Sequence, residues 1–118
     1  MRSFTAALAS ALVAIIGLTA QDVVSARAQE AAVTIEISVK NHKFEPAEIK
    51  APAGKAITLK VKNLDSTPME FESKPLRIEK VIAGNSEASI NVRAQKAGRY
   101  KFFDEYNEKT AQGTLIVE

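Results

Sequence analysis

Hydrophobic and polar residues alternate with a period of two in several segments of this chain. The clearest are Val33–Val39, Ile57–Val61 and Ala88–Val92, in which every second residue is apolar. Successive side chains of a β-strand point to opposite faces, so this alternation predicts strands with one face on a core and one in water. After residue 28, no window of ten or more residues has the spacing of an amphipathic helix. The pattern therefore predicts an all-β domain of mainly antiparallel strands.

Turn-forming residues separate the predicted strands, for example at Pro52–Gly54 and Ala83–Asn85. We expect strands near residues 33–39, 47–51, 56–62, 69–73, 78–82, 87–93, 98–104 and 113–118. Short strands at this spacing are typical of a Greek-key β-sandwich or small barrel, here with about seven to eight strands.

The first 28 residues have the features of a signal helix that precedes the domain. Arg2 is followed by an apolar segment, Phe4–Ala20, and Ala26-Arg27-Ala28 has the small-residue spacing that signal peptidase cleaves. A retained membrane anchor is the alternative, but the apolar run is shorter than the about 20 residues that span a bilayer. We predict a cleaved signal peptide at 1–28, a domain at 29–118, periplasmic localisation, and no membrane insertion after cleavage.

Composition excludes several functions. Removing Arg2, Arg27 and Asp22 with the signal leaves 14 basic and 13 acidic residues, so the predicted domain is nearly neutral. Basic residues form no runs, which argues against nucleic-acid binding. The chain has no Cys and a single His, so it lacks disulfides and the parts of a nucleophilic triad. We expect a monomer or weak dimer that is not an enzyme.

Three polar segments lie at the ends of predicted strands: Asn41–Pro46, which holds His42, Asn63–Glu72, and the acidic Asp104–Glu108. A β-sandwich gathers its connections at two poles, so segments distant in sequence can meet there. These segments are the candidates for a functional site.

The chain resembles the cupredoxins over essentially all of residues 29–118. The segments that carry the resemblance are Phe44–Pro46, Ile49–Lys55, Val61–Asn63, Gly98–Phe102 and Gly113–Val117. A narrower resemblance, in Glu70–Ser73, Glu79–Gly84 and Phe103–Glu108, is to the EfeO-type cupredoxin-like domain of bacterial periplasmic iron-uptake systems. That resemblance implies a cupredoxin-like fold and a role beside ferrous-iron importers.

The resemblance also shows which copper ligands are missing. The positions of the two His ligands hold Met69 and Asn107, the Cys position holds Asp104, and the axial Met falls near Ala111 or Gln112. Type 1 blue copper needs a Cys thiolate with two His. We therefore expect no type 1 blue copper in this protein.

The remaining polar residues suggest a weaker site for a copper or iron ion. Because the cupredoxin layout brings His42, Met69 and Asp104 toward one pole, we predict a labile metal site with mixed ligands. The candidate ligands are His42, Met69, Glu70, Glu72, Asp104 and Asn107. Purely structural roles are the alternatives: a solvated His42, a Met69 that fills the core, and carboxylates that serve solubility.

Two functions follow from these observations. The first is a periplasmic metal-handling module that binds iron or copper weakly and assists ferrous-iron uptake, with an iron permease or a periplasmic iron-binding protein as partner. The second is a metal-free interaction module that docks onto a transporter or another periplasmic protein. A ferroxidase would need a redox-active copper, for which the sequence shows no firm site; an accessory role beside a ferroxidase is the remaining alternative.

Overall fold

The structure, a computed structural model, describes residues 32–118, and the predicted signal peptide therefore lies outside the described residues. Within this range no helix is long and apolar enough to cross a membrane. The chain folds into nine strands and one short 3-10 helix, η1 (Glu105–Asn107). The strands are β1 (Val33–Lys40), β2 (Lys43–Glu45), β3 (Glu48–Ala51), β4 (Ile57–Asn63), β5 (Met69–Ser73), β6 (Ile78–Ile82), β7 (Ser86–Val92), β8 (Gly98–Asp104) and β9 (Gln112–Val117).

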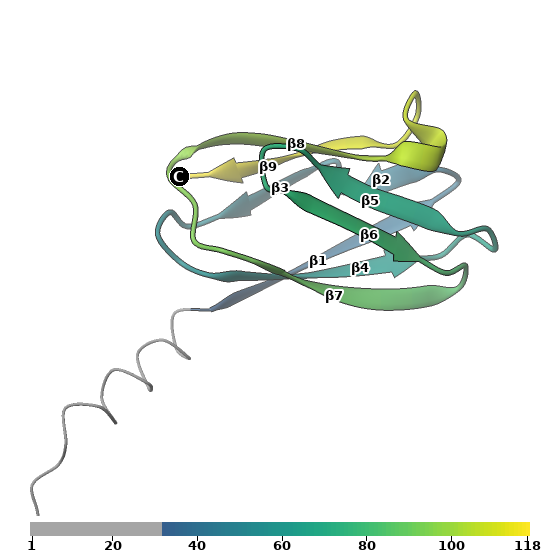
Figure 1. The fold of residues 1–118 in the computed structure, drawn as a ribbon, viewed down its shortest axis with the longest axis horizontal. Helices are drawn as coiled ribbons and strands as arrows, with labels where there is room; N and C mark the ends of the chain where they lie inside the picture. Colours follow the sequence, from purple (N-terminus) through teal and green to yellow (C-terminus); the bar gives the residue numbers. More distant parts are fainter. Residues whose placement is uncertain (1–31) are drawn as a thin grey trace, which may run out of the picture.

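The strands form two sheets that face each other (Figure 1). One sheet has the order β2-β1-β4-β7 and the other β3-β9-β8-β5-β6. Most neighbours are antiparallel, but β1 pairs with β4 and β3 pairs with β9 in parallel. The predicted all-β sandwich is confirmed, with one strand more than the seven to eight expected.

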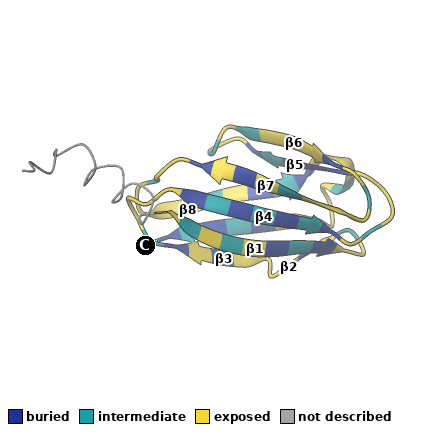
Figure 2. Cartoon of the chain, turned by 90° about the horizontal axis from the view of Figure 1, so that it is seen from below, coloured by how far each residue is buried: buried dark blue, intermediate teal, exposed yellow. Residues whose placement is uncertain are grey.

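The core lies between the sheets and follows the alternation in the sequence. Along β4 every second residue is buried, from Ile57 to Asn63, and Figure 2 shows the same buried and less buried alternation on the neighbouring strands. Three aromatic rings, Phe44, Phe71 and Phe102, pack at its centre with centroids 4.9–6.0 Å apart. These rings join both sheets, because Phe44 belongs to β2 and the other two to β5 and β8.

The additional strand, β2, pairs with the end of β1 through a tight turn. Asn41 and His42 in this turn adopt positive φ angles of 52° and 56°. The carboxylate of Asp65, in the β4–β5 loop, accepts hydrogen bonds from the backbone N–H groups of both residues, at 2.8 and 2.9 Å. Asp65 thus fixes a turn whose backbone conformation non-glycine residues adopt only at a cost.

The strand ends define two poles of the sandwich. At the first, called here the η1 pole, the Asn63 amide donates hydrogen bonds to the carbonyl groups of Thr67, Ile82 and Ala83. These bonds tie the end of β4 to the start of β5 and the end of β6. The opposite pole holds the start of β1 and the C-terminus of the chain (Figure 1).

Candidate metal centre

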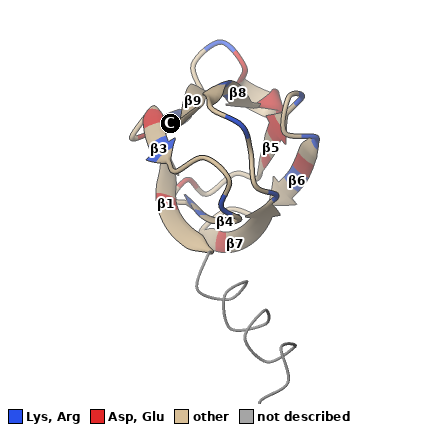
Figure 3. Cartoon of the chain, turned by 90° about the vertical axis from the view of Figure 1, so that its left-hand side faces the viewer, with Lys and Arg blue, Asp and Glu red and all other residues tan. Residues whose placement is uncertain are grey.

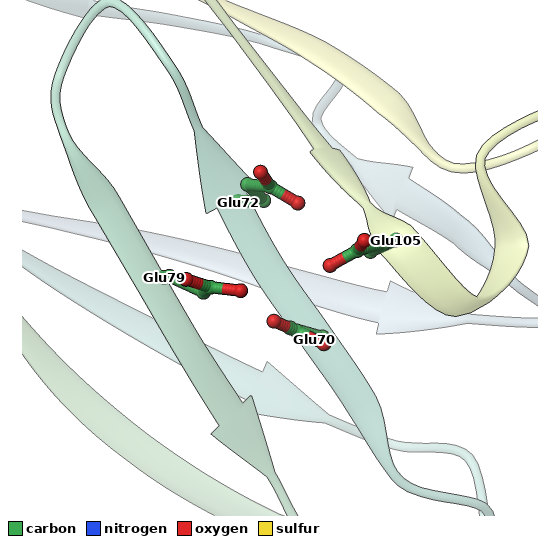
Figure 4. Close-up of side chains that lie close together, drawn as sticks. All are labelled: Glu70, Glu72, Glu79 and Glu105. Atoms are coloured by element: carbon green, nitrogen blue, oxygen red, sulfur yellow. The ribbon is translucent and has the colours of Figure 1, made fainter.

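Four glutamate side chains meet on the outer face of the five-stranded sheet, near the η1 pole (Figure 4). Glu70 and Glu72 come from β5, Glu79 from β6 and Glu105 from η1. One carboxylate oxygen of each lies within 4.8 Å of those of the other three. Within residues 32–118 this is the only group of three or more His, Asp or Glu side chains so arranged. We call it the glutamate cluster.

Strand geometry explains why the first three glutamates share a face. Residues two apart on a strand point the same way, so Glu70 and Glu72 face outward while Met69 and Phe71 enter the core. In the β5–β6 hairpin Glu72 lies directly opposite Glu79. Figure 3 shows acidic positions on both of these neighbouring strands. Opposite like charges destabilise a sheet, so the arrangement is unfavourable without a compensating ion or proton.

Asp104 positions the fourth glutamate, Glu105. The side chain of Asp104 is completely buried, and its Oδ1 accepts hydrogen bonds from the backbone N–H groups of Glu70 (2.9 Å) and Tyr106 (3.0 Å). Its Oδ2 accepts a hydrogen bond from Nδ2 of Asn107 at 3.0 Å. Asp104 is thereby the N-cap of η1 and ties that helix to β5. The same carboxylate thus holds Glu105 beside Glu70.

The close approach of the carboxylates changes their protonation. A hydrogen bond shared with Glu79, together with burial and the negative charge of Glu105, raises the pKa of Glu70 to about 7. The pKa of Glu72 is also raised, mainly by a hydrogen bond shared with Glu105 and secondly by burial. None of the ion pairs between described residues includes a member of the glutamate cluster. The glutamate cluster is therefore a concentrated negative charge that attracts protons or cations.

Tyr106 borders the glutamate cluster. Its side chain is half exposed. Partial burial makes the largest contribution to raising the pKa of its phenol, and the negative charge of Glu70 makes the next largest. On the other side of Glu70 lies its cross-strand partner on β6, Val81, which is also exposed. Two large exposed side chains thus flank the most buried carboxylate of the glutamate cluster.

The predicted ligands do not meet at a single point. Glu70 and Glu72 belong to the glutamate cluster, whereas Met69 is a core residue with 1% of its surface exposed. Asp104 and Asn107 lie beside the glutamate cluster, where the side-chain amide of Asn107 donates a hydrogen bond to the carboxylate of Asp104. His42 is held apart from it, with Nδ1 at 3.6 Å from Oδ2 of Asp65. The mixed site of imidazole, thioether and carboxylate is therefore replaced by a site made of carboxylates, and metal binding itself stays a prediction.

Sequence reasoning missed Glu79 and Glu105 as site residues. A signal for Glu79 was present: the strands predicted at 69–73 and 78–82 form a hairpin in which Ser73 pairs with Ile78 and Glu72 with Glu79. Glu105 lies in the acidic segment Asp104–Glu108, one of the three candidate segments. Its position depends on the Asp104 hydrogen bonds, which no sequence pattern indicates.

Comparison with known proteins agrees with the observed fold. The sequence profile of the family described as "Cupredoxin-like domain" matches residues 7–117. An uncharacterized protein of Rickettsia prowazekii (strain Madrid E) is 36% identical over 83 residues, which cover 70% of this chain and 66% of that protein. The chain thus spans slightly less than two thirds of this relative's length.

Solved structures with the same fold include copper proteins. Auracyanin A, a "blue" copper protein from Chloroflexus aurantiacus, superposes with a TM-score of 0.63 at 18% identity, covering 74% of this chain and 99% of auracyanin. The metal-binding domain of the Cu(I)-exporting P-type ATPase CopA of Streptococcus pneumoniae D39, solved with Cu(I), gives a TM-score of 0.64 at 20% identity, covering 75% and 87%. At these identities the likeness concerns the fold.

Proposed function

Because the chain belongs to the family of cupredoxin-like domains, we propose that it is a periplasmic metal-handling protein that binds iron or copper weakly at the glutamate cluster and assists ferrous-iron uptake. The observation that carries this proposal is the convergence of four carboxylates within 4.8 Å of one another. Copper binding by proteins of the same fold and the resemblance to EfeO-type domains support it.

The shape of the glutamate cluster suits a labile ion. Glu79 and Glu105 are exposed, so an ion held there remains open to solvent and to other proteins on one side. Tight sites use a closed shell of ligands with ordered neighbours. An open shell favours transfer of the ion to a partner, which we propose to be an iron permease or a periplasmic iron-binding protein.

The chemistry proposed is binding and transfer, without catalysis. The chain contains no Cys and cannot supply the thiolate of a type 1 blue copper site. Asp104, at the position of that Cys, uses both carboxylate oxygens to hold neighbouring segments. Electron transfer of the blue-copper kind is therefore not part of the proposed function.

Isothermal titration of the periplasmic protein with Fe²⁺, Cu²⁺ and Cu⁺ tests the proposal. We expect saturable binding of at least one ion, and weaker binding in Glu72→Gln. Glu87→Gln is the matched control, because Glu87 is an exposed glutamate at the start of β7. If none of the three ions binds more tightly than the millimolar range, the protein is not a metal-handling module.

A metal-free interaction module is the second candidate, favoured by the exposed side chains that flank the glutamate cluster. Val81 and Tyr106 are 54% and 52% exposed and are two of only three large hydrophobic residues so exposed in the described chain. Protein interfaces are enriched in aromatic residues such as Tyr, surrounded by a polar rim. If this role is the main one, Val81→Ser and Tyr106→Ser reduce iron uptake by cells while metal titration shows no binding in either variant or the parent.

A further inference from the structure

Glu70 distinguishes the glutamate cluster from an ordinary acidic patch. Only 9% of its surface is exposed, and Figure 4 shows its carboxylate directed toward Glu79 and Glu105. No Lys, Arg or His of residues 32–118 forms an ion pair with it. Buried carboxylates in proteins are generally paired with a cation, coordinate a metal or are neutralised by a proton. Because Glu70 has no cationic partner among the described residues, its carboxylate is a place where a positively charged ligand would replace the proton.

The donor atoms available to such a ligand are all oxygens. The thioether of Met69 lies in the core on the opposite face of β5, and His42 lies beside Asp65 in the β1–β2 turn. Sulfur ligands select Cu⁺, whereas carboxylate oxygens suit hard ions such as Mg²⁺, Ca²⁺ and Mn²⁺. The loss of Met69 from the predicted ligand set thus changes the class of ion that the site prefers.

The spacing of the oxygens also agrees with a hard ion of moderate size. Ca²⁺–oxygen distances are roughly 2.3–2.6 Å, so oxygens on opposite sides of such an ion are about 4.6–5.2 Å apart. The carboxylate oxygens of the glutamate cluster lie within 4.8 Å of one another. One ion of this size can therefore contact several of the four glutamates without a large rearrangement of β5, β6 or η1.

From these observations we propose that the glutamate cluster is selective for hard, oxygen-preferring cations of charge +2 or +3 and discriminates against Cu⁺. This inference rests on the metal-binding function proposed above and narrows it. Of the two metals named there, iron fits the site in either oxidation state, and copper fits it only as Cu²⁺. Glu70 and Glu72 provide the less exposed oxygens, and Glu79 and Glu105 provide the exposed ones.

The chain carries its own reporter for a hard ion at this place. It contains two Tyr and no Trp. Tyr106 borders Glu70, whereas the hydroxyl group of Tyr100 donates a hydrogen bond to the carbonyl group of Lys96, before the start of β8 and away from η1. Tb³⁺ is a hard cation close to Ca²⁺ in size, and it luminesces when an excited Tyr lies close to it. Titration of the protein with Tb³⁺ therefore reports binding and location together.

We expect Tyr-sensitised Tb³⁺ emission that is mostly lost in Tyr106→Phe and retained in Tyr100→Phe. Glu70→Gln and Glu72→Gln should each weaken Tb³⁺ binding about tenfold or more, and the control Glu87→Gln should leave it unchanged. Mn²⁺ and Ca²⁺ should displace Tb³⁺, whereas Cu⁺ supplied from a chelated stock should not. Gln replaces Glu with little change in shape, and far-ultraviolet circular dichroism checks that each variant is folded.

Three outcomes would overturn the inference. Binding of Cu⁺ without binding of Tb³⁺ would refute the hard-ion preference and leave the metal-handling function standing. Tb³⁺ emission that persists in Tyr106→Phe, or unchanged affinity in Glu70→Gln, would place the ion elsewhere on the protein. Absence of binding by Tb³⁺, Mn²⁺ and all forms of iron and copper would refute both the selectivity and the proposed function.

Discussion

Replacing Asp104 by Ala should strongly destabilise the domain. The Asp104 carboxylate accepts three hydrogen bonds in a fully buried position. Without it, the backbone N–H groups of Glu70 and Tyr106 lose their acceptor, while the Asn107 amide can turn toward solvent. A buried donor left without a partner costs about 1–3 kcal/mol. The N–H of Glu70 is buried and that of Tyr106 is part-buried, so the two together give a loss of about 1–4 kcal/mol, a sizeable fraction of the roughly 5–15 kcal/mol that stabilises a typical protein.

Urea denaturation followed by circular dichroism measures this loss, with Asp104→Asn as the matched control. The Asn side chain retains one oxygen that can accept from both backbone groups, so we expect it to recover most of the stability. A free energy of unfolding for Asp104→Ala within about 0.5 kcal/mol of the parent, the usual range for surface substitutions, would refute this account of Asp104. Equal losses in the Ala and Asn variants would show that the effect does not come from the hydrogen bonds.

Three further changes test other parts of the structure. Gly113→Ala should cost about 1–3 kcal/mol in urea denaturation, because a Cβ atom there would overlap the ring of Phe102; an unchanged stability would contradict this packing. The pKa of Glu70 is about 7 in the folded protein against an ordinary value of 4.5, so the folded state binds more protons between these values. The melting temperature of the metal-free protein should therefore fall as the pH rises from 4.5 to 7, and Glu70→Gln should reduce this fall. Asp65→Ala should cost about 1–2 kcal/mol, since two backbone N–H groups lose their acceptor. The hydrogen bond from the N–H of His42 lowers the pKa of Asp65, so the stability lost in the variant should shrink as the parent is acidified through that pKa, which parallel urea titrations can measure.

The fold was largely predictable because strand positions depend on local alternation. The segments expected at 33–39, 56–62 and 98–104 correspond to β1, β4 and β8 within one residue at each end. The exception is β2, whose three residues are too few to show a period. It forms because Asp65, distant in the sequence, holds the preceding turn. Such a long-range contact leaves no local pattern.

The site was less predictable because it depends on register and on side-chain partners. Glu70 and Glu72 stand on one face by the period of a strand, and this much follows from the sequence. The approach of Glu79 requires the pairing of β5 with β6, and that of Glu105 requires the bonds to Asp104. The resemblance to the cupredoxins implies that Asp104 occupies the position of a ligand. Only the structure shows that both of its carboxylate oxygens accept hydrogen bonds from neighbouring segments.

Both ends of the described chain leave the sandwich at the pole opposite η1. The backbone of Val33 bonds to Ala56, and that of Ala53 bonds to Glu118, so the two ends are anchored to the same rim. A domain, linker or lipid anchor joined at either end would therefore lie at the end of the sandwich far from the glutamate cluster and leave the cluster accessible. The same geometry allows this unit to be carried at the tip of a larger assembly, or inserted within one, with its carboxylates presented to whatever approaches from the far side.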